Sequence, residues 1–126
     1  MNATARTFAG AGALSAALAV GMGAFGAHVL RDVLTAHMLE VYRTAVLYHL
    51  VHSLGLLAVA FVCSSKPASG TARTAGWMMA AGLILFCGSL YLLALGGAKW
   101  LGAVTPLGGI ALLLAWLFLA WAVMRN

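Results

Sequence analysis

The sequence predicts an all-α integral membrane protein, a four-helix bundle with an amphipathic segment between its first two helices. Of the 126 residues, 64% are apolar and only 7% are charged, whereas a soluble domain is about 45–50% apolar and about 25% charged. Four apolar segments each approach the roughly 20 residues that cross about 30 Å of hydrocarbon. Because these segments lack the alternating pattern of barrel strands, we expect each of them to be a helix.

The four predicted helices and their short connections account for the whole chain, so we expect one transmembrane domain over residues 1–126. The first apolar segment is longer than the roughly 7–15 residues of a secretory signal core. We therefore expect it to be retained as a helix. The predicted helices cover residues 8–27, 45–63, 75–98 and 106–124.

The first helix carries a small residue at every fourth position, at Ala9, Ala13, Ala17 and Gly21. Such a stripe allows another helix to approach closely. The approaching helix can belong to the same chain or to a second copy. The stripe is therefore compatible with both a monomer and a homo-oligomer.

Most polar residues of the chain lie between the first two helices, in residues 28–43. Apolar residues recur among them at mostly helical spacing, and no glycine or proline occurs between Ala27 and Gly55. This pattern predicts an amphipathic helix that either lies at the membrane interface or runs into the second helix.

The third and fourth helices follow a polar loop at residues 64–73, which has the composition of a turn. Trp77 and Trp100 bracket the third helix, as expected of aromatic anchors at the two membrane interfaces. The fourth helix opens with the sequence TPLGG. We expect Thr105 to be its N-cap and Pro106 to lie in its first turn.

The second helix carries two histidines and a tyrosine within YHLVH, residues 48–52. At about 100° per residue these side chains share one half of the helix, and leucine and phenylalanine fill the other half. Unpaired polar groups are costly in hydrocarbon, so the polar half should face the bundle interior. A rise of 1.5 Å per residue from Thr44 predicts that His49 lies about 8 Å and His52 about 12 Å inside the membrane.

Polar groups of the other helices converge on the same membrane leaflet in an up-and-down topology. Tyr91 is expected about 10 Å from that surface, and Gly88 leaves room beside its phenol. The first helix ends there and the fourth begins there. We therefore expect an outer-leaflet polar cavity that binds a small ligand, a lipid or a partner helix, lined by His28, Tyr42, Tyr48, His49, His52, Tyr91 and Thr105.

Three other interpretations of these polar residues stay open. The same side chains can form interhelical hydrogen bonds that only fix packing, each contributing about 0.6 kcal/mol. His49 and His52 can share a transition metal or haem with His28, in an accessory subunit of a membrane complex, although no carboxylate, thiolate or CxxCH motif supports such a site. An enzyme acting on lipid is the third, but no acid lies at membrane depth to orient His52 beside Ser53.

The basic residues are scattered singly near the ends of the predicted helices, which is a topology pattern and not a nucleic-acid surface. The net charge is +5. The two cysteines lie in separate apolar segments, so we expect neither a disulfide nor a thiolate metal site. The side that holds both termini carries one more basic residue than the other, which favours cytoplasmic termini: Arg6, Lys66, Arg73 and Arg125 against Arg31, Arg43 and Lys99.

Four sequence blocks together resemble the domain of unknown function 423 family, YgdD-like small inner-membrane proteins similar to transmembrane protein 256 of mitochondria. The blocks are GAFGAH (23–28), YRTAVLYHLVH (42–52), GSLYLLAL (88–95) and TPLGG (105–109). The resemblance implies a four-helix protein of the bacterial inner membrane without an established activity. The blocks contain the same polar residues that helix direction and depth bring together.

Overall fold

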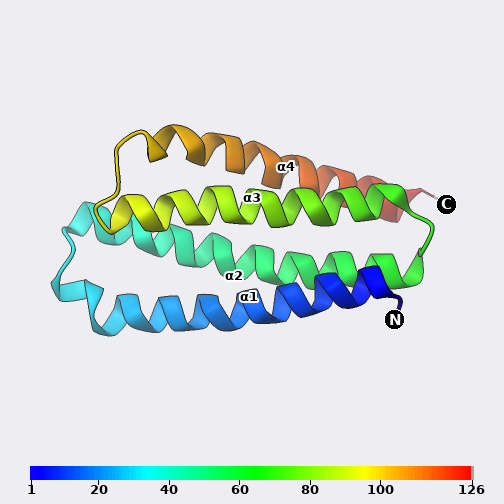
Figure 1. The fold of residues 1–126 in the computed structure, drawn as a ribbon, viewed down its shortest axis with the longest axis horizontal. Helices are drawn as coiled ribbons and strands as arrows, with labels where there is room; N and C mark the ends of the chain where they lie inside the picture. The colour runs from blue at the N-terminus through cyan, green and yellow to red at the C-terminus, as the bar shows by residue number, and fades with distance from the viewer. Residues whose placement is uncertain (126) are drawn as a thin grey trace.

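The computed structural model describes residues 1–125 and consists of four long helices (Figure 1). Each of the four is long and apolar enough to cross a membrane. No strand occurs in residues 1–125, so the predicted all-α membrane fold is confirmed. A short 3-10 turn, η1 (Leu30–Asp32), follows the first of the helices, which are α1 (Ala3–His28), α2 (Ala36–Ser65), α3 (Gly70–Ala94) and α4 (Leu101–Met124).

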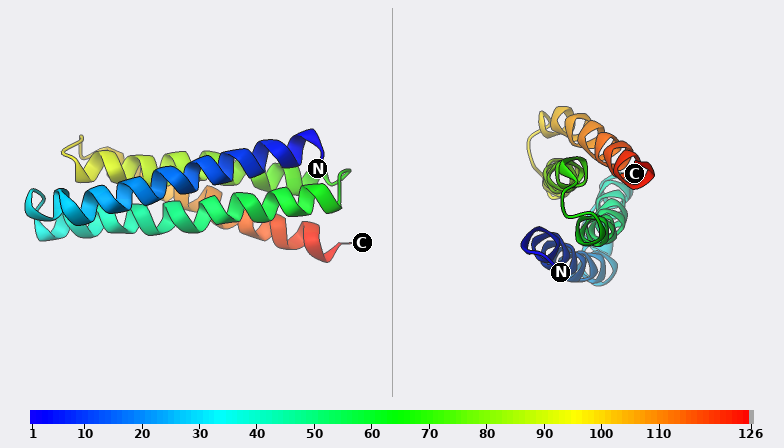
Figure 2. Two further views of the ribbon diagram at one scale, coloured as in Figure 1. Left: turned by 90° about the horizontal axis from the view of Figure 1, so that it is seen from below. Right: turned by 90° about the vertical axis from the view of Figure 1, so that its right-hand side faces the viewer.

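The helices run up and down, and both chain ends lie at the same end of the molecule (Figure 1). The antiparallel pair α2 and α3 forms the middle of the structure. α1 packs along α2, and α4 packs along α3. The end-on view in Figure 2 shows α1 and α4 on opposite sides of the central pair. The four helices therefore form an open row in the order α1, α2, α3, α4. One side of α3 also faces α1.

Side-chain caps explain where three of the helices begin. The Asn2 side chain accepts a hydrogen bond from the Ala5 amide at 2.8 Å, and it also donates to the Cys63 carbonyl at 2.8 Å. α1 therefore begins five residues before the predicted start. Thr35 caps α2 and Ser69 caps α3 in the same way, each accepting from the amide three residues later.

The predicted amphipathic helix over residues 28–43 is wrong in its first half. α1 ends at His28, η1 turns the chain, and α2 starts at Ala36 and continues without a break to Ser65. The Thr35 hydroxyl caps that start, and the side chain of Leu30 is buried against the beginning of α2. Residues 36–43 do run into the second helix, which was one of the two expected arrangements.

The connection between α3 and α4 also differs from the prediction, because α3 ends at Ala94 and α4 begins at Leu101. Gly96 has a φ of 94°, and the Gly97 amide donates to the Leu92 carbonyl at 2.7 Å, which closes α3. The amides of residues 101–103 each bond to the carbonyl three residues earlier and start α4 early. Thr105 is therefore not the N-cap, and Pro106 lies inside the helix.

Candidate ligand-binding site

His49 joins the three helices α1, α2 and α3 through both of its ring nitrogens. Nδ1 lies 2.9 Å from the phenol oxygen of Tyr91 on α3. Nε2 lies 3.0 Å from the hydroxyl oxygen of Ser15 on α1. The imidazole is buried, with 6% of its surface exposed. Each ring nitrogen thus has a partner from a different neighbouring helix.

Ser53 lies one turn beyond His49 on α2 and completes this polar cluster. Its hydroxyl donates to the His49 carbonyl at 2.7 Å, and its oxygen lies 2.7 Å from the Ser15 hydroxyl oxygen. Ser53 is fully buried. The cluster of Ser15, His49, Ser53 and Tyr91 therefore ties α1 and α3 to the middle of α2.

A crevice of about 400 Å³ lies between α1 and α3 above this cluster. Leu14, Leu18 and Ile84 form its mouth and are largely exposed, at 76%, 60% and 71%. His49 and Cys87 lie at its floor and are buried. Because the mouth is formed by the outer surfaces of two membrane-spanning helices, the crevice opens toward lipid. Its lining is Leu14, Ser15, Leu18, His49, Leu83, Ile84, Cys87, Gly88 and Tyr91.

Tyr42 does not line this crevice, but it packs against Tyr91, which does. Its ring is fully buried and meets the Tyr91 ring edge-on, with centroids 5.3 Å apart. Its hydroxyl donates to the Met22 carbonyl of α1. A Cβ at Gly26 would lie 2.5 Å from the Tyr42 ring, so only glycine leaves room for the ring there. Tyr42 thereby holds Tyr91 in place.

His52 and Tyr48 lie on the other side of α2, away from the crevice. The His52 ring stacks on Tyr48 and lies beside Trp116 of α4, with centroids 5.7 and 5.9 Å apart. Its Nδ1 is 2.7 Å from the Tyr48 carbonyl. Tyr48 in turn packs on Phe86 of α3. The structure therefore divides the expected cavity residues between two faces of α2.

His28 and Thr105 are also apart from the crevice. His28 is exposed in the last turn of α1. The Thr105 hydroxyl is 2.6 Å from Ser89, so it joins α4 to α3. Of the seven residues expected around one cavity, the structure brings together His49 and Tyr91, with Tyr42 behind them.

The metal site hypothesised from His28, His49 and His52 is not formed. His49 uses both ring nitrogens in hydrogen bonds to Tyr91 and Ser15. His52 faces α4, and His28 lies at the end of α1. Within residues 1–125, no three His, Cys, Asp or Glu side chains are grouped so that they can hold a metal ion.

Ser15 contributes a hydroxyl to the cluster from α1 and was not among the residues expected at the site. A signal was present, because Ser15 is the one residue with a polar side chain within the apolar segment 8–27. Helical periodicity predicted the direction of the histidines on α2. It carried no information about which residue of α1 faces them.

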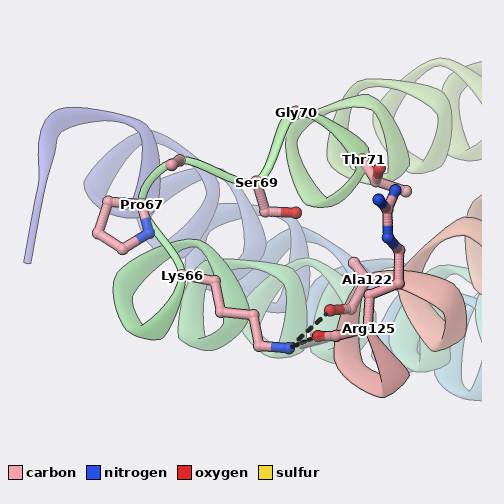
Figure 3. Close-up of a pocket in the computed structure, with 8 residues that line it drawn as sticks. Lys66, Pro67, Ser69, Gly70, Thr71, Ala122 and Arg125 are labelled. Atoms are coloured by element: carbon pink, nitrogen blue, oxygen red, sulfur yellow. Dashed lines mark hydrogen bonds between the residues drawn. The ribbon is translucent and has the colours of Figure 1, made fainter.

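A second cavity, of about 460 Å³, lies at the end of the molecule that holds both termini, between the α2–α3 turn and the end of α4 (Figure 3). Its most prominent feature is the Lys66 ammonium. This group donates to the carbonyls of Ala122 and Val123 at 3.0 Å each, and also to the Arg125 carbonyl. Lys66 therefore caps the C-terminus of α4, and we assign it a structural role.

Comparisons with known proteins also indicate a membrane protein. Residues 22–109 match a family model described as "Protein of unknown function (DUF423)". The chain is 46% identical over 114 residues to "UPF0382 membrane protein YwdK" of Bacillus subtilis, covering 90% of this chain and 93% of that protein. It is 42% identical over 114 residues to a UPF0382 membrane protein of Staphylococcus epidermidis, covering 90% and 92%. No solved structure matches the chain.

Proposed function

This chain belongs to the DUF423 family of membrane proteins, and from that premise we propose that it is a non-enzymatic membrane protein that binds a neutral, lipid-soluble ligand in the crevice between α1 and α3. The crevice itself is the observation that carries this proposal. It combines an apolar wall and mouth with a floor that holds the hydrogen-bonded pair of buried His49 and half-buried Tyr91. Ligand sites commonly have this composition, with a few polar groups in a largely apolar pocket.

The lining and the depth of the crevice support a neutral ligand that reaches it through the membrane. None of the nine lining residues is an acid, a lysine or an arginine. With Thr44 at the membrane surface, five residues of α2 place His49 about 8 Å inside the hydrocarbon. A charged headgroup at that depth would lack both water and a counter-charge, which is unfavourable.

The hydrogen bonds of the cluster support a binding role over a catalytic one. A hydrolytic nucleophile needs a base that is itself oriented by a third group, usually an acid. Here His49 is oriented by Tyr91, and Ser53 donates its proton to the His49 carbonyl and not to an imidazole nitrogen. The Ser15 hydroxyl does lie 3.0 Å from Nε2 of His49. The group that orients His49 is a phenol and not an acid, however, so the arrangement supports a fixed imidazole over an activated serine.

We also propose that the protein lies in the bacterial inner membrane with both termini in the cytoplasm, and that lipids cover the outer surfaces of its helices. The bacterial relatives that are named membrane proteins support the location. The orientation is supported by the basic residues, four of which lie at the end that holds both termini and three at the opposite end.

Filling the crevice tests the proposal. Gly88 lines the crevice, and a Cβ there would meet no atom within 4 Å. Gly88→Leu should therefore occupy the ligand space without disturbing the helices. A diazirine-bearing alkanol, photoactivated in vesicles that contain the protein, should label residues around the crevice in the unmodified protein. We expect Gly88→Leu to reduce this labelling about tenfold, since the leucine takes the space that the probe needs.

Gly21→Leu is the matched control. Gly21 is exposed on α1, and a Cβ there also meets no atom within 4 Å. The control adds the same side chain to a lipid-facing position, so its labelling should equal that of the unmodified protein. Labelling spread evenly over the lipid-facing helix surfaces, or unchanged by Gly88→Leu, would contradict the proposal.

A further inference from the structure

We infer that the crevice ligand is an alcohol or phenol that donates its hydroxyl proton to the oxygen of Tyr91. This oxygen is the open end of a hydrogen-bonded chain that uses all of its own protons. The inference rests on the proposed function and specifies the chemistry of its ligand. The ligand class follows from the order of donors and acceptors in the cluster of Ser15, His49, Ser53 and Tyr91.

The four hydrogen bonds of the cluster form together in one arrangement of its protons. Ser53 donates to the His49 carbonyl, which can only accept, and the Ser53 oxygen therefore accepts from the Ser15 hydroxyl. Ser15 then has no proton left for His49. The imidazole proton is therefore on Nε2, which donates to Ser15 at 3.0 Å. Nδ1 is left to accept from the Tyr91 hydroxyl at 2.9 Å.

Tyr91 differs from the other members of this chain, because it donates without accepting. Ser15, His49 and Ser53 each accept one hydrogen bond and donate one. The Tyr91 oxygen accepts from no other group within residues 1–125, and Tyr91 lines the crevice. A ligand hydroxyl that donates to this oxygen would extend the chain by one bond. Hydrogen bonds in such a chain polarise and strengthen one another.

A ligand that can only accept, such as a ketone, gains nothing from this chain. Tyr91 can donate to a ketone only after the imidazole proton moves to Nδ1 and the Ser15 hydroxyl turns to Nε2. Ser53 then has one proton for two contacts, so the cluster loses one bond for the bond that the ketone gains. An alcohol gains one bond and the cluster loses none. One net hydrogen bond corresponds to about a fivefold difference in affinity.

A hydroxyl is the donor that suits the lining of the crevice. An ammonium or guanidinium donor would bring a charge to a lining that contains no acid. Two membrane sources supply an uncharged hydroxyl. One is a free lipid-soluble alcohol or phenol, and the other is the glycerol hydroxyl of a diacylglycerol. The open space at Gly88 leaves room for an alkyl chain or a ring beside Tyr91.

The test compares naphthyl nonyl ketone with the alcohol obtained by reducing its carbonyl, and decylnaphthalene is the baseline. The protein is placed in phosphatidylcholine vesicles, because this lipid has no O–H or N–H group that competes with the probes. The excess uptake of each radiolabelled probe over empty vesicles, at equal mole fraction in the lipid, gives its affinity. We expect the alcohol to bind about fivefold more tightly than the ketone, and the ketone to bind like the hydrocarbon.

His49→Leu should remove this preference, because Tyr91 loses its acceptor and its proton becomes free for a ligand. Ketone uptake should rise about fivefold, to the level of the alcohol. Constant uptake of decylnaphthalene would show that the variant retains the crevice. His52→Leu is the matched control, since it makes the same substitution on α2 where the ring faces Trp116 and not the crevice. It should leave the preference for the alcohol unchanged.

Nitrogen NMR of the unmodified protein gives a second readout that depends neither on a ligand nor on the folding of a variant. The ¹⁵N chemical shift distinguishes a protonated from an unprotonated imidazole nitrogen. We expect His49 to be protonated at Nε2. His52 is the internal reference with the opposite tautomer, because its Nδ1 donates to the Tyr48 carbonyl. A proton on Nδ1 of His49 would overturn the inference.

The outcomes separate this inference from the proposed function. Ketone uptake equal to or above alcohol uptake, or a preference for the alcohol that survives His49→Leu, would overturn the hydroxyl inference and leave the crevice as an apolar binding site. Uptake of none of the three probes would overturn the proposed function itself.

Competition then distinguishes the two sources of the hydroxyl. Displacement of the radiolabelled alcohol by dioleoylglycerol would identify the glycerolipid hydroxyl as an occupant. Displacement by hexadecanol alone would identify a free alcohol as the occupant. Displacement by neither compound would overturn the hydroxyl inference.

Discussion

Gly108 lies at a close approach between the backbones of α3 and α4. A Cβ at this position would lie 2.4 Å from the amide nitrogen of Phe86. Backbone atoms cannot move aside as a flexible side chain can, so the two helices would have to separate. Small residues serve the same purpose in other membrane helix pairs, where they allow close van der Waals packing.

Gly108→Ala should therefore destabilise the protein by about 1–3 kcal/mol, the range for overpacking a tight contact. The measurement is reversible unfolding in mixed detergent micelles, followed by circular dichroism. Gly109→Ala is the control, since its Cβ would lie 3.6 Å from the Phe86 ring, an ordinary contact. Equal stability of the two variants would show that the α3–α4 approach is not fixed by Gly108.

The sequence predicted the direction of the His49 side chain, but it did not predict all of the residues around that side chain. Its position on the polar half of the second helix follows from helical periodicity alone, and the structure buries it. Tyr91 was expected nearby from depth, and it is hydrogen-bonded to His49. The separation of His52 from His49 was not predictable, because it depends on where α1 and α4 lie around α2. Periodicity on one helix does not specify those positions.

At the scale of a single element, the C-terminus of α4 is capped by a residue that is remote in the sequence. Its last carbonyl groups have no intrahelical partners, as at every helix C-terminus. The Lys66 ammonium from the end of α2 donates to three carbonyls in residues 122–125, as Figure 3 shows for two of them. The positive charge also complements the negative end of the helix dipole.

Lys66→Met should loosen the last turn of α4 by about 0.3–1 kcal/mol, since it removes both the hydrogen bonds and the charge. Amide hydrogen exchange at residues 121–124 should become faster, while exchange in the middle of α4 stays unchanged. Arg73→Met is the control because it removes an exposed basic residue from the same end of the molecule. Equal exchange in the two variants would contradict the capping role.

The ends of elements were the least predictable part of the fold, and the reasons are local. The Asn2 cap starts α1 at Ala3, whereas composition had predicted a start at residue 8. The TPLGG sequence has the pattern of a helix start, yet bonds of the 3-10 type before it begin α4 at Leu101. Hydropathy locates the apolar middle of a span, whereas caps and turn bonds decide its ends.

At the scale of the whole molecule, the helices form a row in which α1 and α4 lie on opposite sides of α2 and α3 (Figure 2). Composition predicts four spans and an up-and-down course, because short loops join antiparallel neighbours. It does not distinguish a closed ring from an open row. The crevice between α1 and α3 depends on the helices forming an open row. This explains why no single sequence block predicted it.

The proposed orientation can be tested with single cysteines at the two ends. Ala68 lies in the turn at the end that holds both termini, and Lys99 lies in the connection at the opposite end. In intact cells, a membrane-impermeant maleimide should label Lys99→Cys, whereas Ala68→Cys should react only after lysis. The natural thiols of Cys63 and Cys87 are buried and add little background. The reverse pattern would place both termini outside.

Under the proposed function, the crevice mouth formed by Leu14, Leu18 and Ile84 is the route by which the ligand enters and leaves. A guest that enters sideways never crosses water, so its encounter with the protein is a two-dimensional search within the bilayer. Occupancy is then governed by the mole fraction of the guest among the surrounding lipids and not by its concentration in the aqueous phase. Diluting the membrane with added lipid should empty the protein, while diluting the buffer should not.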